Sequence, residues 1–231
     1  MLKAIILDFN GVILDDELLH FKAMQEAVAV LDITLTKEAY WEKYLPLDDT
    51  DCLEAVCRDN SVHLTDDRGA HLIELKNALY NQQLQNRFPL FPGVAEFIKS
   101  AAQNYPLALA SGARREEIEA TLRATGLNQY FHVIVAAEDF TLGKPHPESF
   151  LLALERLNTE RGTMSSAINP EECLVIEDSI GGVAGAIAAG MKCLAISNSY
   201  PAEKLQKANR VARSLEEVQI ESLPALFEQP S

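Results

Sequence analysis

Short runs of apolar residues recur along the chain, and longer stretches with helical spacing separate them. The runs do not alternate with polar residues, which indicates strands that are covered on both faces. Strands of this kind with helices between them are typical of a parallel α/β sheet. We therefore predict an α/β fold with a doubly wound parallel sheet. The predicted strands are Ala4–Leu7, Leu107–Ala110, Val133–Val135, Leu174–Ile176 and Cys193–Ile196.

The interval between the first two predicted strands is too long for a single crossover connection. Between residues 15 and 87 the spacing of apolar positions is wholly helical, which indicates an inserted helical cap. The segment Phe88–Gly93 contains two prolines and a glycine and returns the chain to the sheet. We expect a core formed by 1–14 and 88–231 and an all-helical cap at 15–87. Two cap faces are predicted: Phe21, Met24, Val28 and Leu31; and Leu72, Leu75 and Leu79.

The charge and composition of the chain limit the classes of partner that it is expected to bind. The 20 Lys and Arg residues against 34 Asp and Glu give a net charge of −14, so a broad cationic surface for nucleic acid or an anionic membrane is not expected. Apolar runs stay far below the ~20 residues of a membrane helix, and the N-terminus lacks a signal-peptide pattern. The four cysteines form no CxxC pair, which favours reduced thiols in the cytoplasm. A monomer is the default expectation.

Polar residues follow four of the predicted strands. Asp8 comes directly after the first strand, Ser111 after the second, and Glu177 and Asp178 after the fourth. Lys144 follows the third strand at a short distance. The carboxyl ends of parallel strands meet at one edge of a sheet, where ligands bind. The sequence therefore predicts one polar site at this edge.

The residue types at these strand ends favour phosphoryl chemistry. Asp8, Glu177 and Asp178 offer hard oxygen ligands, which suit Mg²⁺ better than zinc. A carboxylate beside Mg²⁺ can attack phosphorus, so Asp8 is the candidate nucleophile. Lys144 would supply a fixed positive charge, and Ser111 a hydroxyl donor at the start of a helix.

Each of these residues also has an ordinary structural interpretation. A single Asp after a strand is commonly a turn or N-cap residue, and Glu177 with Asp178 is equally explained as an acidic pair at a helix start. Gly143-Lys144-Pro145 is not a phosphate-binding P-loop, because proline stands where that loop has Ser or Thr. The glycine-rich run 181–190 indicates a helix that packs close to the sheet and ends at Gly190.

Taken in order, the motifs resemble those of the haloacid dehalogenase superfamily of phosphatases and phosphotransferases, over essentially the whole chain. Asp8-Phe9-Asn10-Gly11-Val12 resembles the nucleophile loop, and Ala110-Ser111-Gly112 the hydroxyl motif. Gly143-Lys144-Pro145 resembles the lysine motif, and Ile176-Glu177-Asp178-Ser179 the acidic metal motif. The resemblance implies a Rossmann-like core with the helical cap of the branch that contains β-phosphoglucomutase and phosphoglycolate phosphatase.

The same resemblance implies a role for each matching residue. Asp8 would be the nucleophile and a Mg²⁺ ligand, with Asp178 as a second carboxylate ligand and Glu177 binding directly or through water. Ser111, Gly112 and Lys144 would hold the phosphoryl oxygens. In the cap, His20 and Lys76 fall where the sugar-phosphate mutases carry a His and a Lys that face the substrate. A His on a helix is, however, more often a surface or packing residue.

This chain departs from the family at Asn10. The family carries an Asp there that moves a proton to the leaving oxygen, and its backbone carbonyl binds the metal. Asn10 keeps the backbone carbonyl that would bind the metal, but its side-chain amide cannot transfer the proton. Losing general acid–base help costs on the order of 10²–10⁴ in rate. Three explanations remain open: an engineered Asp→Asn change, another proton carrier such as His20, or a protein that has lost catalysis.

The function favoured by these motifs is Mg²⁺-dependent hydrolysis of a phosphate monoester of a small metabolite. The acidic stretch Leu47–Cys52 stands where the mutases grip a second phosphate, which favours a substrate with one phosphate. The alternatives are a non-catalytic protein that binds a phosphorylated metabolite, a β-phosphoglucomutase-like phosphotransferase, and C–P bond cleavage through a lysine Schiff base.

Overall fold

The computed structural model describes residues 1–45, 47–84, 88–162 and 166–228. The chain divides into two compact units: Met1–Asp15 with Phe88–Ser231, the sheet unit, and Asp16–Arg87, the helical unit. Asp15 belongs to the sheet unit, where its amide donates to the carbonyl of Pro89 at 2.8 Å. The return to the sheet unit passes through 85–87, which lie outside the described residues.

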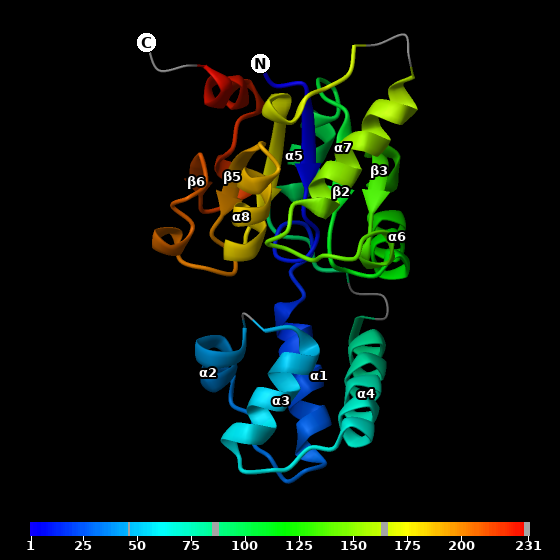
Figure 1. Cartoon of the computed structure of the whole chain (residues 1–231), viewed down its shortest axis with the longest axis vertical. Coiled ribbons are helices and arrows are strands. Elements are labelled where there is room, and N and C mark those ends of the chain that lie inside the picture. Colours follow the sequence, from blue (N-terminus) through cyan, green and yellow to red (C-terminus); the bar gives the residue numbers. More distant parts are fainter. Residues whose placement is uncertain (46, 85–87, 163–165, 229–231) are drawn as a thin grey trace. The chain divides into compact units, whose positions relative to one another are not determined.

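The sheet unit is built on six parallel strands in the order β3-β2-β1-β4-β5-β6 (Figure 1). Leu7 stands opposite Leu109 on one side and Ile176 on the other. The strands are β1 (Ala4–Leu7), β2 (Leu107–Ala110), β3 (Phe131–Val135), β4 (Cys173–Glu177), β5 (Lys192–Ile196) and β6 (Arg210–Ala212).

The predicted α/β fold is confirmed, and five of these strands lie at the predicted apolar runs. β1 and β2 have the predicted ends, and β3, β4 and β5 each extend slightly further. β6 was not predicted, because its three residues lie at the margin of the sheet and Ala212 alone is buried. A strand this short leaves no apolar run in the sequence.

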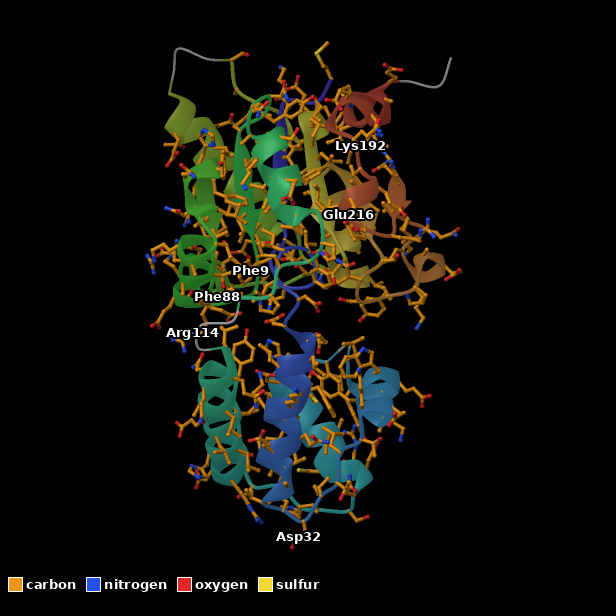
Figure 2. The ribbon with its side chains drawn as sticks, turned by 180° about the vertical axis from the view of Figure 1, so that it is seen from behind. Phe9, Asp32, Phe88, Arg114, Lys192 and Glu216 are labelled. Atoms are coloured by element: carbon orange, nitrogen blue, oxygen red, sulfur yellow. The ribbon has the colours of Figure 1, made fainter. Side chains whose placement is uncertain are left out.

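Helices cover both faces of the sheet. α7 and α8 lie on the face nearest the viewer in Figure 1, and α5 lies on the opposite face, which Figure 2 shows from the front. The glycine-rich α8 packs close to α7, since a Cβ at Gly185 would lie 3.2 Å from the ring of Phe150, closer than ordinary van der Waals contact. Gly190 follows the helix with φ +76, as expected for its C-terminal stop. The helices are α5 (Val94–Ala101), α6 (Arg115–Ala124), α7 (Glu148–Arg161) and α8 (Ile180–Ala188).

Single turns of 3₁₀ helix complete the connections of the sheet unit, and a longer 3₁₀ segment stands near its C-terminus. They are Asn128–Tyr130, Ala137–Asp139, Pro170–Glu172, Ala202–Lys204, Leu215–Glu217 and Ile220–Phe227.

The helical unit has its own apolar core, which includes Phe21, Met24, Val28 and Leu72. None of the helices in the described residues is both long and apolar enough to cross a membrane. The elements are α1 (Glu17–Ala29), α2 (Lys37–Ala39), a π-helical turn at Tyr40–Tyr44, α3 (Asp49–Asp59) and α4 (Asp66–Leu84).

One face of α4 differs from the prediction. Leu75 and Leu79 are only half-buried, whereas Leu72, Lys76 and Tyr80 are buried. Residues four apart lie above one another on a helix, so the buried stripe runs through a lysine and a tyrosine. Apolar spacing alone cannot reveal such a stripe, because its polar members are stabilised by partners on other helices.

The strand order reverses direction between β1 and β4. From β1 the chain continues to β2 and β3 on one side, and it then crosses to β4, β5 and β6 on the other. Crossovers that diverge in this way leave a crevice at the carboxyl ends of the two central strands. Asp8 follows β1, and Glu177 ends β4 directly beside it.

Candidate active site

The loop after β1 holds Asp8 at the carboxyl end of the sheet. The amide of Asp8 donates to the carbonyl of Ile176 at 3.0 Å, which continues the β1–β4 pairing by one step. The next residue, Phe9, is fully buried, and its carbonyl accepts from the amides of Ile13 and Leu14 at 2.7 and 3.1 Å (Figure 2). This tight turn anchors the loop, so the buried Asp8 side chain has a defined position.

Lys144 bridges the two central strand ends. Its ammonium donates to Oδ1 of Asp8 and to Oε1 of Glu177, each at 2.6 Å, and it lies 4.9 Å from the centre of the Phe150 ring. The two carboxylates raise the pKa of Lys144 and outweigh its burial, so it remains charged. The predicted cation of the site is therefore in contact with the predicted nucleophile.

Glu177 is fully buried at the end of β4. Its Oε2 accepts from the amides of Asp178 and Ser179, both at 2.8 Å, and from the Ser179 hydroxyl at 3.0 Å. That hydroxyl also accepts from the amide of Gly182 at 2.9 Å and so caps α8. One carboxylate oxygen is thus saturated by donors at the start of α8, while the other faces Lys144.

Asp8, Glu177 and Asp178 form an acidic cluster, with carboxylate oxygens within 4.8 Å of one another. Burial is the main cause that raises the pKa of Asp8 to about 6, and Glu177 adds to it, while Lys144 acts in the opposite direction. Burial, Glu177 and Asp8 likewise raise the pKa of Asp178 well above its usual range. Lys144 offsets one of three negative charges, so the cluster has the charge and the all-oxygen donor set that fit a divalent cation.

The other predicted residues lie at neighbouring strand ends of the same edge. Ser111 is buried after β2, its amide donates to the carbonyl of Val135 at 3.0 Å, and its Oγ accepts from the amide of Ala113 at 3.2 Å. Gly112 is exposed with open space around it, and Asn10 is half-buried in the Asp8 loop. The backbone thus places all three at the carboxyl edge of the sheet.

His20 and Lys76 contact each other within the helical unit. Lys76, which is buried, donates to Nδ1 of His20 and to Oδ2 of Asp49, each at 2.7 Å. Nε2 of His20 and the hydroxyl of Tyr80 share Oδ2 of Asp16, at 3.1 and 2.6 Å. Because Lys76 donates to Nδ1, the ring proton of neutral His20 belongs on Nε2. Asp16 raises the pKa of His20 although burial alone would lower it.

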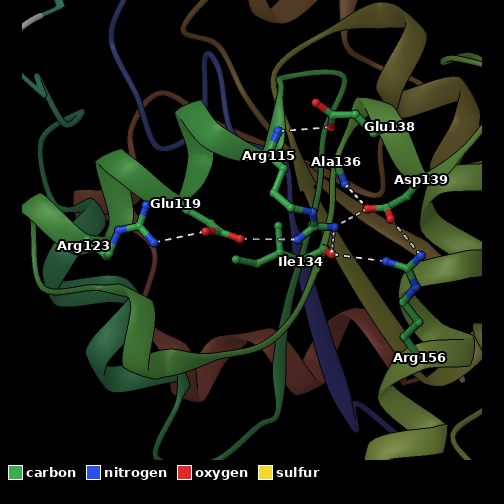
Figure 3. Close-up of polar contacts among 8 residues, drawn as sticks. All are labelled: Arg115, Glu119, Arg123, Ile134, Ala136, Glu138, Asp139 and Arg156. Carbon is green, nitrogen blue, oxygen red and sulfur yellow. Dashed lines mark hydrogen bonds and ion pairs between the residues drawn. The ribbon is translucent and has the colours of Figure 1, made fainter.

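A second charged network in the sheet unit is centred on Asp139 (Figure 3). Asp139 accepts from the guanidinium groups of Arg115 and Arg156, at 2.5 and 2.9 Å, and from the amide of Ala136 at 2.8 Å. Both guanidinium groups also donate to the carbonyl of Ile134, at 3.2 and 3.4 Å. The network joins the start of α6, the end of β3 and the middle of α7.

Sequence reasoning missed the loop after β5. Asn198 donates to the carbonyl of Gly11 at 2.7 Å, and the hydroxyl of Ser199 donates to Oδ2 of Asp178. The signal was present, because Ser197-Asn198-Ser199 directly follows an apolar strand, as the other site segments do. The fifth strand end therefore also contributes to the site.

Comparison with known proteins decides the family. A model of haloacid dehalogenase-like hydrolases matches residues 2–190. The chain belongs to this family. The family expected from the motifs is thereby confirmed. The expected enzyme class, a phosphatase of this family, is confirmed by this match together with the related phosphatases described next.

Individual relatives agree with that assignment. The chain is 31% identical over 201 residues to the phosphorylated carbohydrates phosphatase of Thermotoga maritima, covering 83% of each protein. It is 34% identical over 140 residues to the chloroplastic 5-amino-6-(5-phospho-D-ribitylamino)uracil phosphatase of Arabidopsis thaliana, which is 60% of this chain and 35% of that protein.

A solved structure covers nearly the whole chain. The crystal structure of an aspartate-to-asparagine mutant of CbbY from Rhodobacter sphaeroides, in complex with xylulose-(1,5)bisphosphate, matches with a TM-score of 0.77 and 26% identity. The match covers 94% of this chain and 96% of that one.

Proposed function

We propose that this protein hydrolyses the phosphate monoester of a small phosphorylated metabolite, with Mg²⁺ as cofactor and Asp8 as nucleophile. The observation that carries the proposal is the contact of Asp8 with Lys144 inside an acidic cluster at the carboxyl edge of the sheet. A phosphorylated carbohydrate is the substrate class suggested by the relative from Thermotoga maritima.

The residues divide the reaction between them. The Asp8 carboxylate attacks phosphorus, so that an aspartyl phosphate forms as the ester P–O bond breaks and the leaving oxygen takes a proton from water. Water then attacks the aspartyl phosphate, which releases inorganic phosphate and restores Asp8. Lys144 favours the ionised form of Asp8 and, with the Ser111 hydroxyl, holds the phosphoryl oxygens. Asp8, Glu177, Asp178 and the backbone carbonyl of Asn10 would hold Mg²⁺.

Bound Mg²⁺ would offset the charge of the acidic cluster and of the phosphoryl group. The cluster fits this role, because it gathers three buried carboxylates against one lysine.

Asn10 slows turnover but not binding, since an amide cannot relay the proton of the leaving oxygen. The CbbY mutant supports the second half of this statement, because an aspartate-to-asparagine member of the fold holds a phosphorylated sugar in its crystal structure. A non-catalytic protein that binds a phosphorylated metabolite is the alternative that Asn10 favours.

We further propose that the substrate carries one phosphate. The resemblance to the sugar-phosphate mutases puts the stretch Leu47–Cys52 where those enzymes grip a second phosphate, and here this stretch carries three aspartates, which repel a dianion. A β-phosphoglucomutase-like transfer between two phosphorylated positions is accordingly disfavoured.

Phosphate release from a panel of monoesters, with Mg²⁺ and with EDTA, tests the proposal. We expect slow, Mg²⁺-dependent release by the parent chain and none by Asp8→Asn. Release by Asp8→Asn at the parent rate would exclude the mechanism. Saturable, Mg²⁺-dependent binding of a metabolite with no release above background would establish the binding protein instead.

A further inference from the structure

The loop after β5 reaches both carboxyl-edge loops that carry the acidic cluster. Asn198 and Ser199, which we call the β5 clamp, are half-buried neighbours in this loop. The side-chain amide of Asn198 donates to the carbonyl of Gly11 at 2.7 Å, in the loop after β1. The hydroxyl of Ser199 donates to Oδ2 of Asp178, in the loop after β4.

The two contacts meet at one point of the site. Gly11 has φ +75, and a Cβ there would overlap the carboxylate of Asp178. The backbone of Gly11 and the side chain of Asp178 are therefore packed against each other. The β5 clamp holds one partner by its carbonyl and the other by its carboxylate, so it fixes both sides of this contact.

We propose that Asn198 and Ser199 are positioning residues that hold Asp178 against the Asp8 loop and thereby set the affinity of the acidic cluster for Mg²⁺. This inference rests on the proposed function, because it needs the cluster to bind that ion. Side chains that orient metal-binding carboxylates by hydrogen bonds change metal affinity about 10–100-fold when they are removed. Gly11 lies three residues after Asp8, so the clamp acts on the nucleophile loop as well.

The neighbouring Ser197 provides a matched control. Its hydroxyl donates to the carbonyl of Ala212 at 3.4 Å, in the adjacent strand β6, and its amide donates to the same carbonyl. Ser197→Ala therefore removes a hydroxyl from the same loop without removing a contact to the acidic cluster. Ser199→Thr keeps a hydroxyl at the clamp and serves as the rescuing variant.

Calorimetric titration of EDTA-stripped protein with Mg²⁺ alone measures the proposed effect directly. We expect the Kd of Ser199→Ala to rise about 10–100-fold, the Kd of Ser197→Ala to match the parent, and Ser199→Thr to recover most of the affinity. Equal affinity of Ser199→Ala and the parent overturns the inference, as does an equal loss in Ser197→Ala. A parent chain that binds no Mg²⁺ overturns the metal role in the proposed function and this affinity effect together.

Amide hydrogen exchange of the metal-free protein tests the clamp without any ion. Asn198→Ala should speed exchange in the segment from Phe9 to Leu14, because the Gly11 carbonyl loses its side-chain donor. Ser197→Ala should leave that segment at the parent rate. Unchanged exchange in Asn198→Ala would show that the clamp does not hold the Asp8 loop, whatever the metal titration gives.

Discussion

Gly182 leaves open the space that the carboxylate of Glu177 fills, since a Cβ at this glycine would overlap that carboxylate. Gly181 lies one residue earlier in α8, and a Cβ there would make only ordinary van der Waals contacts with the backbone and Cβ of Lys144. Two adjacent glycines of one helix thus differ in whether the structure requires the absence of a side chain. Gly182 makes room for a site residue, and Gly181 does not.

Alanine at these two positions should therefore have opposite effects. We expect Gly182→Ala to cost about 1–3 kcal/mol of unfolding free energy, because Glu177 must leave its place at the start of α8. Gly181→Ala should be neutral or stabilising by up to about 1 kcal/mol, since alanine favours the helix. Urea denaturation of both variants measures the difference, and equal stability of the two would contradict the packing argument.

Restoring an acid at position 10 should raise turnover. We expect Asn10→Asp to increase kcat for phosphate release on the order of 10²–10⁴-fold with little change in KM, because general acid–base help acts on the transition state. Steady-state kinetics on both chains, with the Asp8→Asn, Asn10→Asp double variant as the inactive control, provides the check. Comparable rates for the parent and Asn10→Asp would assign the proton to another group, and His20 would be the next residue to replace.

Asp8 should make the metal-free protein less stable as the pH rises. Its pKa is about 6 in the folded chain against an ordinary value of 3.8, so the folded state binds more protons between these values. The stability that Asp8 contributes is therefore present at low pH and is lost as the pH rises through about 6. The quantity to measure in EDTA is the unfolding free energy of the parent minus that of Asp8→Asn. This difference should be smaller at pH 7 than at pH 4.5. A constant or rising difference would be inconsistent with the burial of this carboxyl.

Removing Asp139 should destabilise the sheet unit. Asp139→Ala leaves two guanidinium groups and the amide of Ala136 without their shared acceptor, for which we expect a loss of about 1–3 kcal/mol at pH 7. Hydrogen bonds from Arg156 and Ala136 help to lower the pKa of Asp139 although burial opposes them, so its contribution should vanish as the pH falls below that lowered value. Arg123→Ala, which removes an exposed partner of Glu119, is the control and should cost less than about 0.5 kcal/mol. Similar losses in both variants would rule out a special role of Asp139.

The Lys76–Asp49 pair should respond unequally to the loss of its two members. Asp49→Ala leaves a buried ammonium without its carboxylate and should cost about 1–3 kcal/mol, a range reduced for the partial exposure of Asp49. Lys76→Met removes the buried charge itself, keeps much of the side-chain volume and should cost less. Chemical denaturation of both variants gives the comparison, and a larger loss for Lys76→Met would show that the ammonium stabilises the helical unit.

The parts of the fold and site that could be predicted share one physical basis. Strands such as Ala4–Leu7 are buried on both faces, so their composition reveals them, and the rule that polar residues gather at strand ends then located Asp8, Lys144, Glu177 and Asp178. β6 was not predicted, because only one of its three residues is buried and the strand therefore leaves no apolar run in the sequence. The β5 clamp escaped because Asn and Ser are common in loops, and only the fold shows that their donors reach Gly11 and Asp178.

The buried stripe of α4, formed by Leu72, Lys76 and Tyr80, was not predicted for a different reason. A buried lysine is expensive unless its partners are in place, and those of Lys76 come from α1 and α3, distant in sequence. Helical periodicity assigns buried positions to leucines by default, and it therefore selected Leu75 and Leu79. Pairwise chemistry between helices, rather than the pattern within one helix, determined which face is buried.

The two arginines that bind the Ile134 carbonyl also bear on self-association. β3 is an outer strand of the sheet. The carbonyl of Val135 points to the neighbouring strand β2 and accepts from the amide of Ser111. Because successive carbonyls of a strand point in opposite directions, the carbonyl of Ile134 points away from the sheet. An outward carbonyl on an outer strand is a ready acceptor for a strand of another molecule. Arg115 and Arg156 already occupy it, and the opposite outer strand, β6, has only three residues. The sheet thus ends on one side at a strand whose Ile134 carbonyl is already bonded and on the other at a strand of three residues, and both features disfavour pairing with a strand of another molecule.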